Sequence, residues 1–151
     1  MRRTLLPPNN PIFTDHVNFP AGATMLTLPW VTGLIMTPFG FLFGPIVAWN
    51  LSIAFMLWAF GFSTAWLIQK LTSSWSAGIL FGGLMTSQPM LMHAVSDGTP
   101  EHISLWGMPF FLGALWTALH NASTKWGIIA GATAFIIAID SPYHAIYCAL
   151  A

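Results

Sequence analysis

The chain has 151 residues, of which 56% are hydrophobic and only 5% are charged. In ordinary soluble domains about a quarter of the residues are charged, so this composition excludes such a domain and indicates that lipid surrounds most of the chain. The formal net charge is zero, and the sequence therefore gives no electrostatic basis for binding a nucleic acid.

The first 44 residues divide into a polar and an apolar part. Residues 1–23 are rich in turn-forming Pro, Gly and Asn, and they predict an aqueous loop that contains Asp15. Residues 24–44 are apolar, but prolines and glycines interrupt them. Because Pro kinks or breaks a helix, this stretch fits either one kinked helix that spans the membrane or juxtamembrane helices that lie along its surface.

Four apolar runs follow, and each predicts a transmembrane helix. The first of them contains neither a charged residue nor Pro, and its 24 residues correspond to about 36 Å of helix, which is enough to cross a bilayer. The four runs cover residues 46–69, 75–95, 101–120 and 126–140.

Proline also marks where several helices kink or begin. We expect Pro89 to kink the second run. Thr99-Pro100 and Ser141-Pro142 have the pattern of a capping residue followed by Pro at the first helical position. The last apolar run, 143–151, has about half of the roughly 20 residues that a span needs, so we interpret it as the start of a truncated helix and expect the chain to be a fragment.

These elements predict an all-α fold. We expect residues 1–151 to form a single membrane domain, an integral helical bundle with four or five transmembrane helices plus juxtamembrane helices. Lys70 and Lys125 are separated by two predicted spans and so lie on the same side, which the positive-inside rule assigns to the cytoplasm. Asp97, Glu101 and Asp140 then face the opposite compartment, and Asp15 joins them only if residues 24–44 do not span.

Residues 92–102 form the first candidate site, because two of the four acids of the chain lie there with two histidines. Carboxylates and imidazoles in close proximity can bind a divalent cation or transfer a proton. The site residues would be Asp97, Glu101, His93 and His102. The competing interpretation is an ordinary loop, since lipid excludes charges and Glu101 would suit the first turn of a helix.

Two other groups of residues are weaker candidates. Asp140 and His144 flank the predicted helix start at Pro142, where they either extend the same outer surface or only cap a helix. Asp15 is a loop acid without a distinctive neighbourhood. Three Gly-x-x-x-Gly spacings indicate close packing of helices within the chain, namely Gly40/Gly44, Gly78/Gly82 and Gly127/Gly131.

Several short motifs together resemble the membrane region of glycosyltransferases with the GT-C fold. Residues 18–22 (Asn-Phe-Pro-Ala-Gly) resemble the Pro-Gly segment before a juxtamembrane helix in bacterial mannosyltransferase-like membrane proteins, which are related to the protein O-mannosyltransferases. Residues 43–51 (Phe-Gly-Pro-Ile-Val-Ala-Trp-Asn-Leu) resemble the entry into their second span. Residues 87–102 and 127–143 resemble later spans with their outer loops. The order of the motifs carries more weight than any single one.

This resemblance implies a transferase that takes its sugar from a polyprenyl-phosphate donor at the extracytoplasmic face of a bacterial inner membrane. Such families use an outer-loop acid as general base, which would give catalytic roles to Asp97, Glu101 and Asp15. It implies substrate-binding roles for His102, His93, Asp140 and His144, and a divalent cation such as Mg²⁺ or Mn²⁺ in some members. Residues 24–44 would then be juxtamembrane.

The alternative to an enzyme is a non-catalytic membrane protein, either a transporter or an assembly subunit. Transporters place ionisable groups and broken helices near the midplane of the bilayer. The acids of this chain lie at the ends of predicted spans, which favours a site at the outer face.

Overall fold

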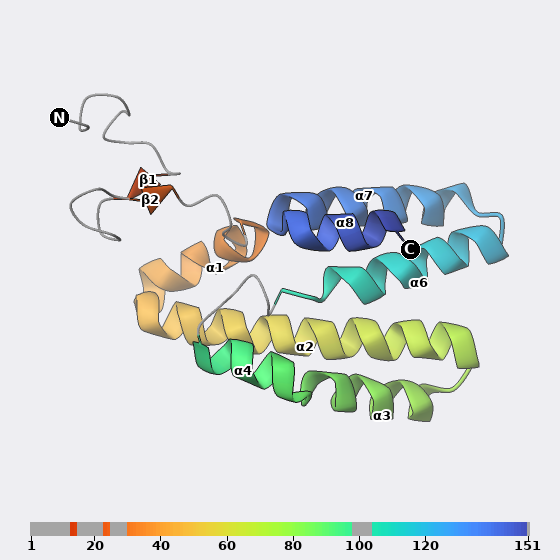
Figure 1. Ribbon diagram of the computed structural model, residues 1–151, viewed down its shortest axis with the longest axis horizontal. Coiled ribbons are helices and arrows are strands. Elements are labelled where there is room, and N and C mark those ends of the chain that lie inside the picture. Colours follow the sequence, from red (N-terminus) through yellow and green to blue (C-terminus); the bar gives the residue numbers. More distant parts are fainter. Residues whose placement is uncertain (1–12, 15–22, 25–29, 98–103, 151) are drawn as a thin grey trace.

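The computed structural model describes residues 13–14, 23–24, 30–97 and 104–150 of the chain, and most of these residues are helical (Figure 1). The two strands, β1 (Phe13–Thr14) and β2 (Ala23–Thr24), have two residues each and pair antiparallel, with Phe13 opposite Thr24. The expected all-α class is confirmed.

The helices run back and forth along α2, the longest of them. They are α1 (Trp30–Phe43), α2 (Pro45–Thr72), α3 (Trp75–Thr86), α4 (Pro89–Asp97), α6 (Gly107–His120), α7 (Thr124–Asp140) and α8 (Pro142–Leu150). Along its length α2 packs against α3 and α6, while α7 packs between α6 and α8. The helices therefore form an antiparallel arrangement in which successive chain reversals lie at opposite ends of the bundle (Figure 1).

Local sequence explains where several helices begin and end. Gly44 separates α1 from α2 with φ 85°, a left-handed conformation that Gly adopts without strain, and Pro45 follows in the first turn of α2. At the other end of α2, Ser73 adopts φ 57°, and the Ser74 side chain caps α3 by accepting a hydrogen bond from the Ala77 N–H. Pro142 begins α8, where the sequence predicts a helix start.

The apolar run 75–95 is two helices rather than one kinked helix. It is interrupted at Ser87 and Gln88, and α4 starts at Pro89, because Pro has no N–H to continue the hydrogen-bond ladder. Among the described residues of the run 101–120, helix α6 begins only at Gly107. The predicted start at Thr99-Pro100 lies outside the described residues.

Within the described residues, α2 is the only helix that is long and apolar enough to cross a membrane by itself. Its 28 residues correspond to about 42 Å of helix, more than the roughly 30 Å thickness of a bilayer core. The remaining helices have between 9 and 17 residues.

Glycines allow α2 and α3 to pack at backbone contact. A Cβ atom added to Gly78 would lie 2.4 Å from the carbonyl oxygen of Ala65, and one added to Gly82 would lie 2.5 Å from that of Gly61. The expectation of packing within the chain thus holds for this pair. It is wrong for Gly127 and Gly131, which are exposed on α7 with nothing within 4 Å of an added Cβ.

Two apolar clusters hold the bundle together. At one end of the bundle Met56 and Phe60 of α2 pack with Leu91 and Ala94 of α4, and Leu105 and Trp106 cover this core. Near the other end the Trp66 ring lies 5.2 Å from Phe110 and 5.7 Å from Trp126, centroid to centroid, which ties α2 to α6 and α7. These two clusters fix the relative placement of the helices that carry the acids and the lysines.

Acids and lysines lie at opposite ends of the bundle. Lys70 is in the last turn of α2 and Lys125 is in the first turn of α7, and the Trp66–Trp126 contact brings these two helix ends together. Asp97 and Asp140 are the last residues of α4 and α7, at the other end (Figure 1). We call these the lysine end and the acid end.

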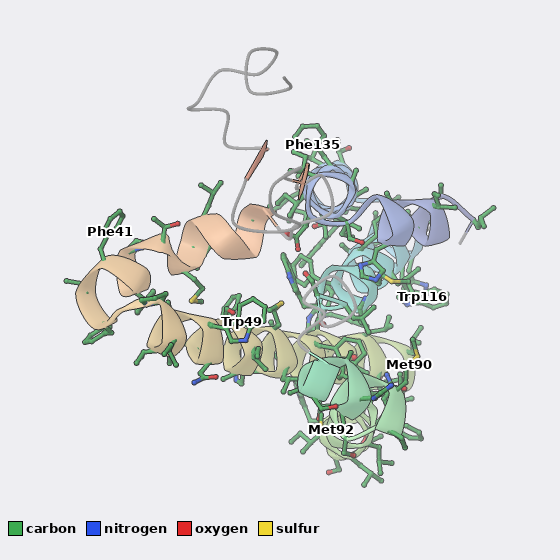
Figure 2. The ribbon with its side chains drawn as sticks, turned by 60° about the vertical axis from the view of Figure 1, so that its left-hand side comes forward. Phe41, Trp49, Met90, Met92, Trp116 and Phe135 are labelled. Atoms are coloured by element: carbon green, nitrogen blue, oxygen red, sulfur yellow. The ribbon has the colours of Figure 1, made fainter. Side chains whose placement is uncertain are left out.

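A hairpin made of α1 and the first half of α2 projects from the acid end, as Figure 2 shows. Phe41 is at its tip with 88% of its surface exposed, and Ile46 is 77% exposed. There is no charged residue between Asp15 and Lys70. The hairpin is therefore apolar over most of its exposed surface.

Candidate functional site

The carboxylate of Asp140 joins three segments of the chain at the acid end. Asp140 is the last residue of α7 and is only 4% exposed. Its Oδ1 accepts a hydrogen bond of 3.0 Å from the backbone N–H of Val31, in the first turn of α1. Its Oδ2 accepts a hydrogen bond from the hydroxyl group of Ser104, three residues before α6.

The local structure accounts for both bonds. The first N–H groups of a helix have no partner inside the helix, and the helix dipole favours a negative charge beside them. Asp140 supplies that charge from a helix 109 residues further along the chain. A buried carboxylate is costly unless donors surround it, and the Val31 N–H and the buried Ser104 hydroxyl are such donors.

A small pocket adjoins this carboxylate. Its polar lining is Ser104, Asp140, Ser141 and His144, and its apolar lining includes Trp106 and Ile137. The volume open to the centre of a water molecule is ≈ 10 Å³, which is room for about one water. In this conformation the pocket is therefore too small to hold a sugar.

Ser141 and His144 are the other buried polar residues of the pocket, at 3% and 6% exposure. The Ser141 hydroxyl has no hydrogen-bond partner among the described residues, although its backbone carbonyl accepts from the Ala145 N–H in the first turn of α8. Trp106 lines the pocket and also packs against the Met56–Leu91 core. The pocket is thus continuous with the packing of α4 against α2.

Of the predicted site residues, the structure brings Asp140 and His144 together in one pocket. Asp97 ends α4, and His93 is exposed one turn before it. The other three predicted residues, Asp15, Glu101 and His102, lie outside the described residues. Asp15 directly follows β1, and the other two belong to the stretch of chain between Asp97 and Ser104.

Sequence reasoning missed three of the groups that build this site. The Val31 donor is a backbone N–H, which no side-chain pattern reveals. Ser104 is a single hydroxyl in an apolar run and resembles many serines that bond to their own helix. Ser141 was assigned only as a capping residue, and its burial depends on how α7 and α8 pack.

The described residues do not supply a metal site, since no group of three His, Cys, Asp or Glu side chains comes together within the ranges 30–97 and 104–150. The Asp140 carboxylate is hydrogen-bonded on both oxygens and closed off from solvent. In this arrangement it holds chain segments in place, and direct contact with a substrate would require the pocket to open.

Comparison with known proteins gives no relative from which a role can be transferred. No protein family, curated protein or solved structure matches the chain. Any functional assignment therefore rests on the residues, their packing and the short motifs described above.

Proposed function

We propose that the chain is part of a polytopic membrane glycosyltransferase of the GT-C type, which transfers a sugar from a polyprenyl-phosphate donor at the extracytoplasmic face. The observation that carries this proposal is the separation of charge along the bundle. Lys70 and Lys125 lie at one end, and Asp97 and Asp140 lie at the other. A cytoplasmic lysine end satisfies the positive-inside rule and directs the acids outward.

The membrane setting is supported by the exposed apolar surface. Large hydrophobic side chains on α2, α3 and α7 are exposed, among them Trp58 at 64%, Ile79 at 68% and Phe135 at 67%. Water would not tolerate so large an apolar surface, whereas lipid favours it. We propose that α2, the α3–α4 pair, α6 and α7 cross the bilayer, with α8 as the start of a further crossing.

In this scheme α1 does not cross the membrane. Its first turn bonds to Asp140 at the acid end, and its last residue is separated only by Gly44 from the start of α2, also at that end. This supports the juxtamembrane alternative for residues 24–44.

The proposed reaction places Asp97 as general base. Its carboxylate takes the proton of an acceptor hydroxyl, the acceptor oxygen bonds to the anomeric carbon, and the bond from that carbon to the phosphate oxygen breaks. The polyprenyl phosphate leaves with the bonding electrons. Glu101 and Asp15 are further candidates for this base, and His93, His102 and His144 are candidates for binding the donor.

The test is transfer of radiolabelled sugar from a polyprenyl-phosphate donor in membranes that contain the full-length protein. Asp97→Asn should abolish transfer while the amount of protein in the membrane stays normal, because the amide cannot accept the proton. The matched control is Ser96→Ala, since Ser96 is exposed and, among the described residues, its hydroxyl bonds only to the His93 carbonyl of its own helix. Normal activity of the Asp97→Asn variant would refute the assignment of the base.

A second candidate is a non-catalytic assembly subunit of the membrane. It is favoured by the observation that the buried carboxylate of Asp140 is hydrogen-bonded to α1 and to Ser104 and so holds both to α7. The same assay separates the two candidates, because a subunit of this kind transfers no sugar in its unmodified form.

A further inference from the structure

We infer that Asp140 is a positioning residue that fastens the start of α1 and the segment at Ser104 to the end of α7. The sequence and its resemblance imply a substrate-binding role for this acid, but both carboxylate oxygens are engaged by the chain itself. The catalytic consequence of this inference rests on the proposed function, whereas the fastening does not.

Because Asp140 is buried, losing either of its two hydrogen bonds would be energetically costly. With 4% exposure the carboxylate has almost no access to water, so losing a donor would leave a buried charge only partly compensated. Ser104 is also buried, at 6% exposure, and its hydroxyl would lose its acceptor at the same time. Moving Ser104 away from α7 would therefore leave both a buried acceptor and a buried donor without a partner, and moving α1 away would leave the Asp140 carboxylate with one donor fewer.

Helix α1 depends on attachments of this kind because most of its own surface is not packed. Leu34 is 71% exposed and Leu42 is 74% exposed. Helix α1 packs closely against α2 and α7. The bond from the Val31 N–H to Asp140 fixes its first turn, while Gly44 connects its last turn to α2. Without Asp140, α1 would be held to the bundle only by its packing against α2 and by its remaining contacts with α7.

The two attachment points, Val31 and Ser104, follow in the chain the two stretches that contain predicted site residues. Val31 is the second residue of α1, which follows the stretch that contains Asp15, and Ser104 follows directly the stretch that contains Glu101 and His102. One carboxylate thus fixes the described ends of both stretches. We therefore expect Asp140 to control activity through position and not through contact with the sugar.

The fastening can be measured by hydrogen–deuterium exchange of the full-length protein in lipid nanodiscs. Asp140→Ala removes both acceptors and should speed exchange in the first turns of α1 by at least about tenfold, as expected for a lost hydrogen bond to a charged group. Exchange at the α2–α3 contact around Gly78 should stay unchanged. Unchanged exchange in α1 would overturn the inference.

Variants at the donors keep the test decisive if Asp140→Ala does not accumulate. Val31→Pro removes the N–H at a position in the first helical turn where Pro is tolerated. Val31→Ala is the comparison, because it changes the side chain and keeps the N–H. Faster exchange in α1 with Pro but not with Ala supports the fastening. Equal exchange in the two variants refutes it. Ser104→Ala should speed exchange at Leu105–Gly107 instead.

The conservative variant separates position from substrate contact. In Asp140→Asn the amide oxygen can still accept from the Val31 N–H, so protection of α1 and sugar transfer should both remain well above those of Asp140→Ala. Loss of transfer in Asp140→Asn with α1 still protected would show that the carboxylate acts on the substrate and would overturn the inference. If the unmodified protein transfers no sugar, the proposed function fails, while the exchange results still decide the fastening.

Discussion

Gly78 and Ala65 bring α3 and α2 into backbone contact, because a Cβ atom on Gly78 would lie 2.4 Å from the Ala65 carbonyl oxygen. The close approach is repeated one turn later at Gly82. Small residues at such contacts let membrane helices pack by van der Waals attraction where no hydrophobic effect drives them together. The placement of α4, and with it Asp97, depends on this contact, since α4 continues from α3.

We predict that Gly78→Ala destabilises the protein, because the clash is with backbone and no side-chain rotation can relieve it. The expected loss is about 1–3 kcal/mol of the free energy of unfolding, measured by denaturant titration in detergent micelles. The control is Gly83→Ala, also on α3, where an added Cβ meets nothing within 4 Å. Gly83→Ala should be neutral or stabilising by up to about 1 kcal/mol, and equal losses in the two variants would contradict the close contact.

Gly44 is predicted to be needed for the sharp reversal between α1 and α2. Its φ of 85° and ψ of 163° lie in a region that essentially only Gly adopts, and placing a residue with a Cβ there costs roughly 1–3 kcal/mol. Gly44→Ala should therefore lower the unfolding free energy by that amount although nothing lies within 4 Å of the added Cβ. The control is Gly33→Ala inside α1, where an added Cβ also meets nothing within 4 Å and φ is not positive. A greater loss of stability in Gly33→Ala than in Gly44→Ala would argue against the reversal.

The third glycine prediction concerns the aromatic cluster near the lysine end. A Cβ on Gly113 would lie 2.4 Å from the Trp66 ring, so Gly113→Ala should displace that ring from Phe110 and Trp126. The change is visible as a shift in tryptophan fluorescence and as a loss of about 1–3 kcal/mol in stability. Gly131→Ala, on the exposed face of α7, should change neither, and an unchanged spectrum in Gly113→Ala would contradict the packing of α6 on α2.

The sequence was sufficient to predict the helical class and the alternation of the chain. The apolar runs have the length of helices, and the lysines lie at the turns between them, so the two ends of the bundle follow from counting reversals. The start of α8 also follows from its sequence, because Ser141-Pro142 is a local signal. Such features depend on residues that are neighbours in the chain.

The built site was not predictable in the same way. The sequence favours a helix-capping loop over a site at Asp140, and the feature that distinguishes this acid is its bond to a backbone N–H 109 residues away. The interruption at Ser87 and Gln88 was expected only as a kink, because hydropathy does not report whether the helix resumes in the same direction after Pro. Gly127 and Gly131 repeat the spacing of Gly78 and Gly82 but face outward, since the spacing does not specify which face of a helix is covered.

An outer acid end and a cytoplasmic lysine end can be distinguished by labelling each end of the bundle from one side of the membrane. In a background where the buried Cys148 is replaced by Ala, Asp97→Cys and Lys125→Cys are treated with a membrane-impermeant maleimide in right-side-out vesicles. We predict that Asp97→Cys is labelled in intact vesicles and that Lys125→Cys is labelled only after permeabilisation. Labelling of both in intact vesicles, or of Lys125→Cys alone, would contradict an acid end at the outer face.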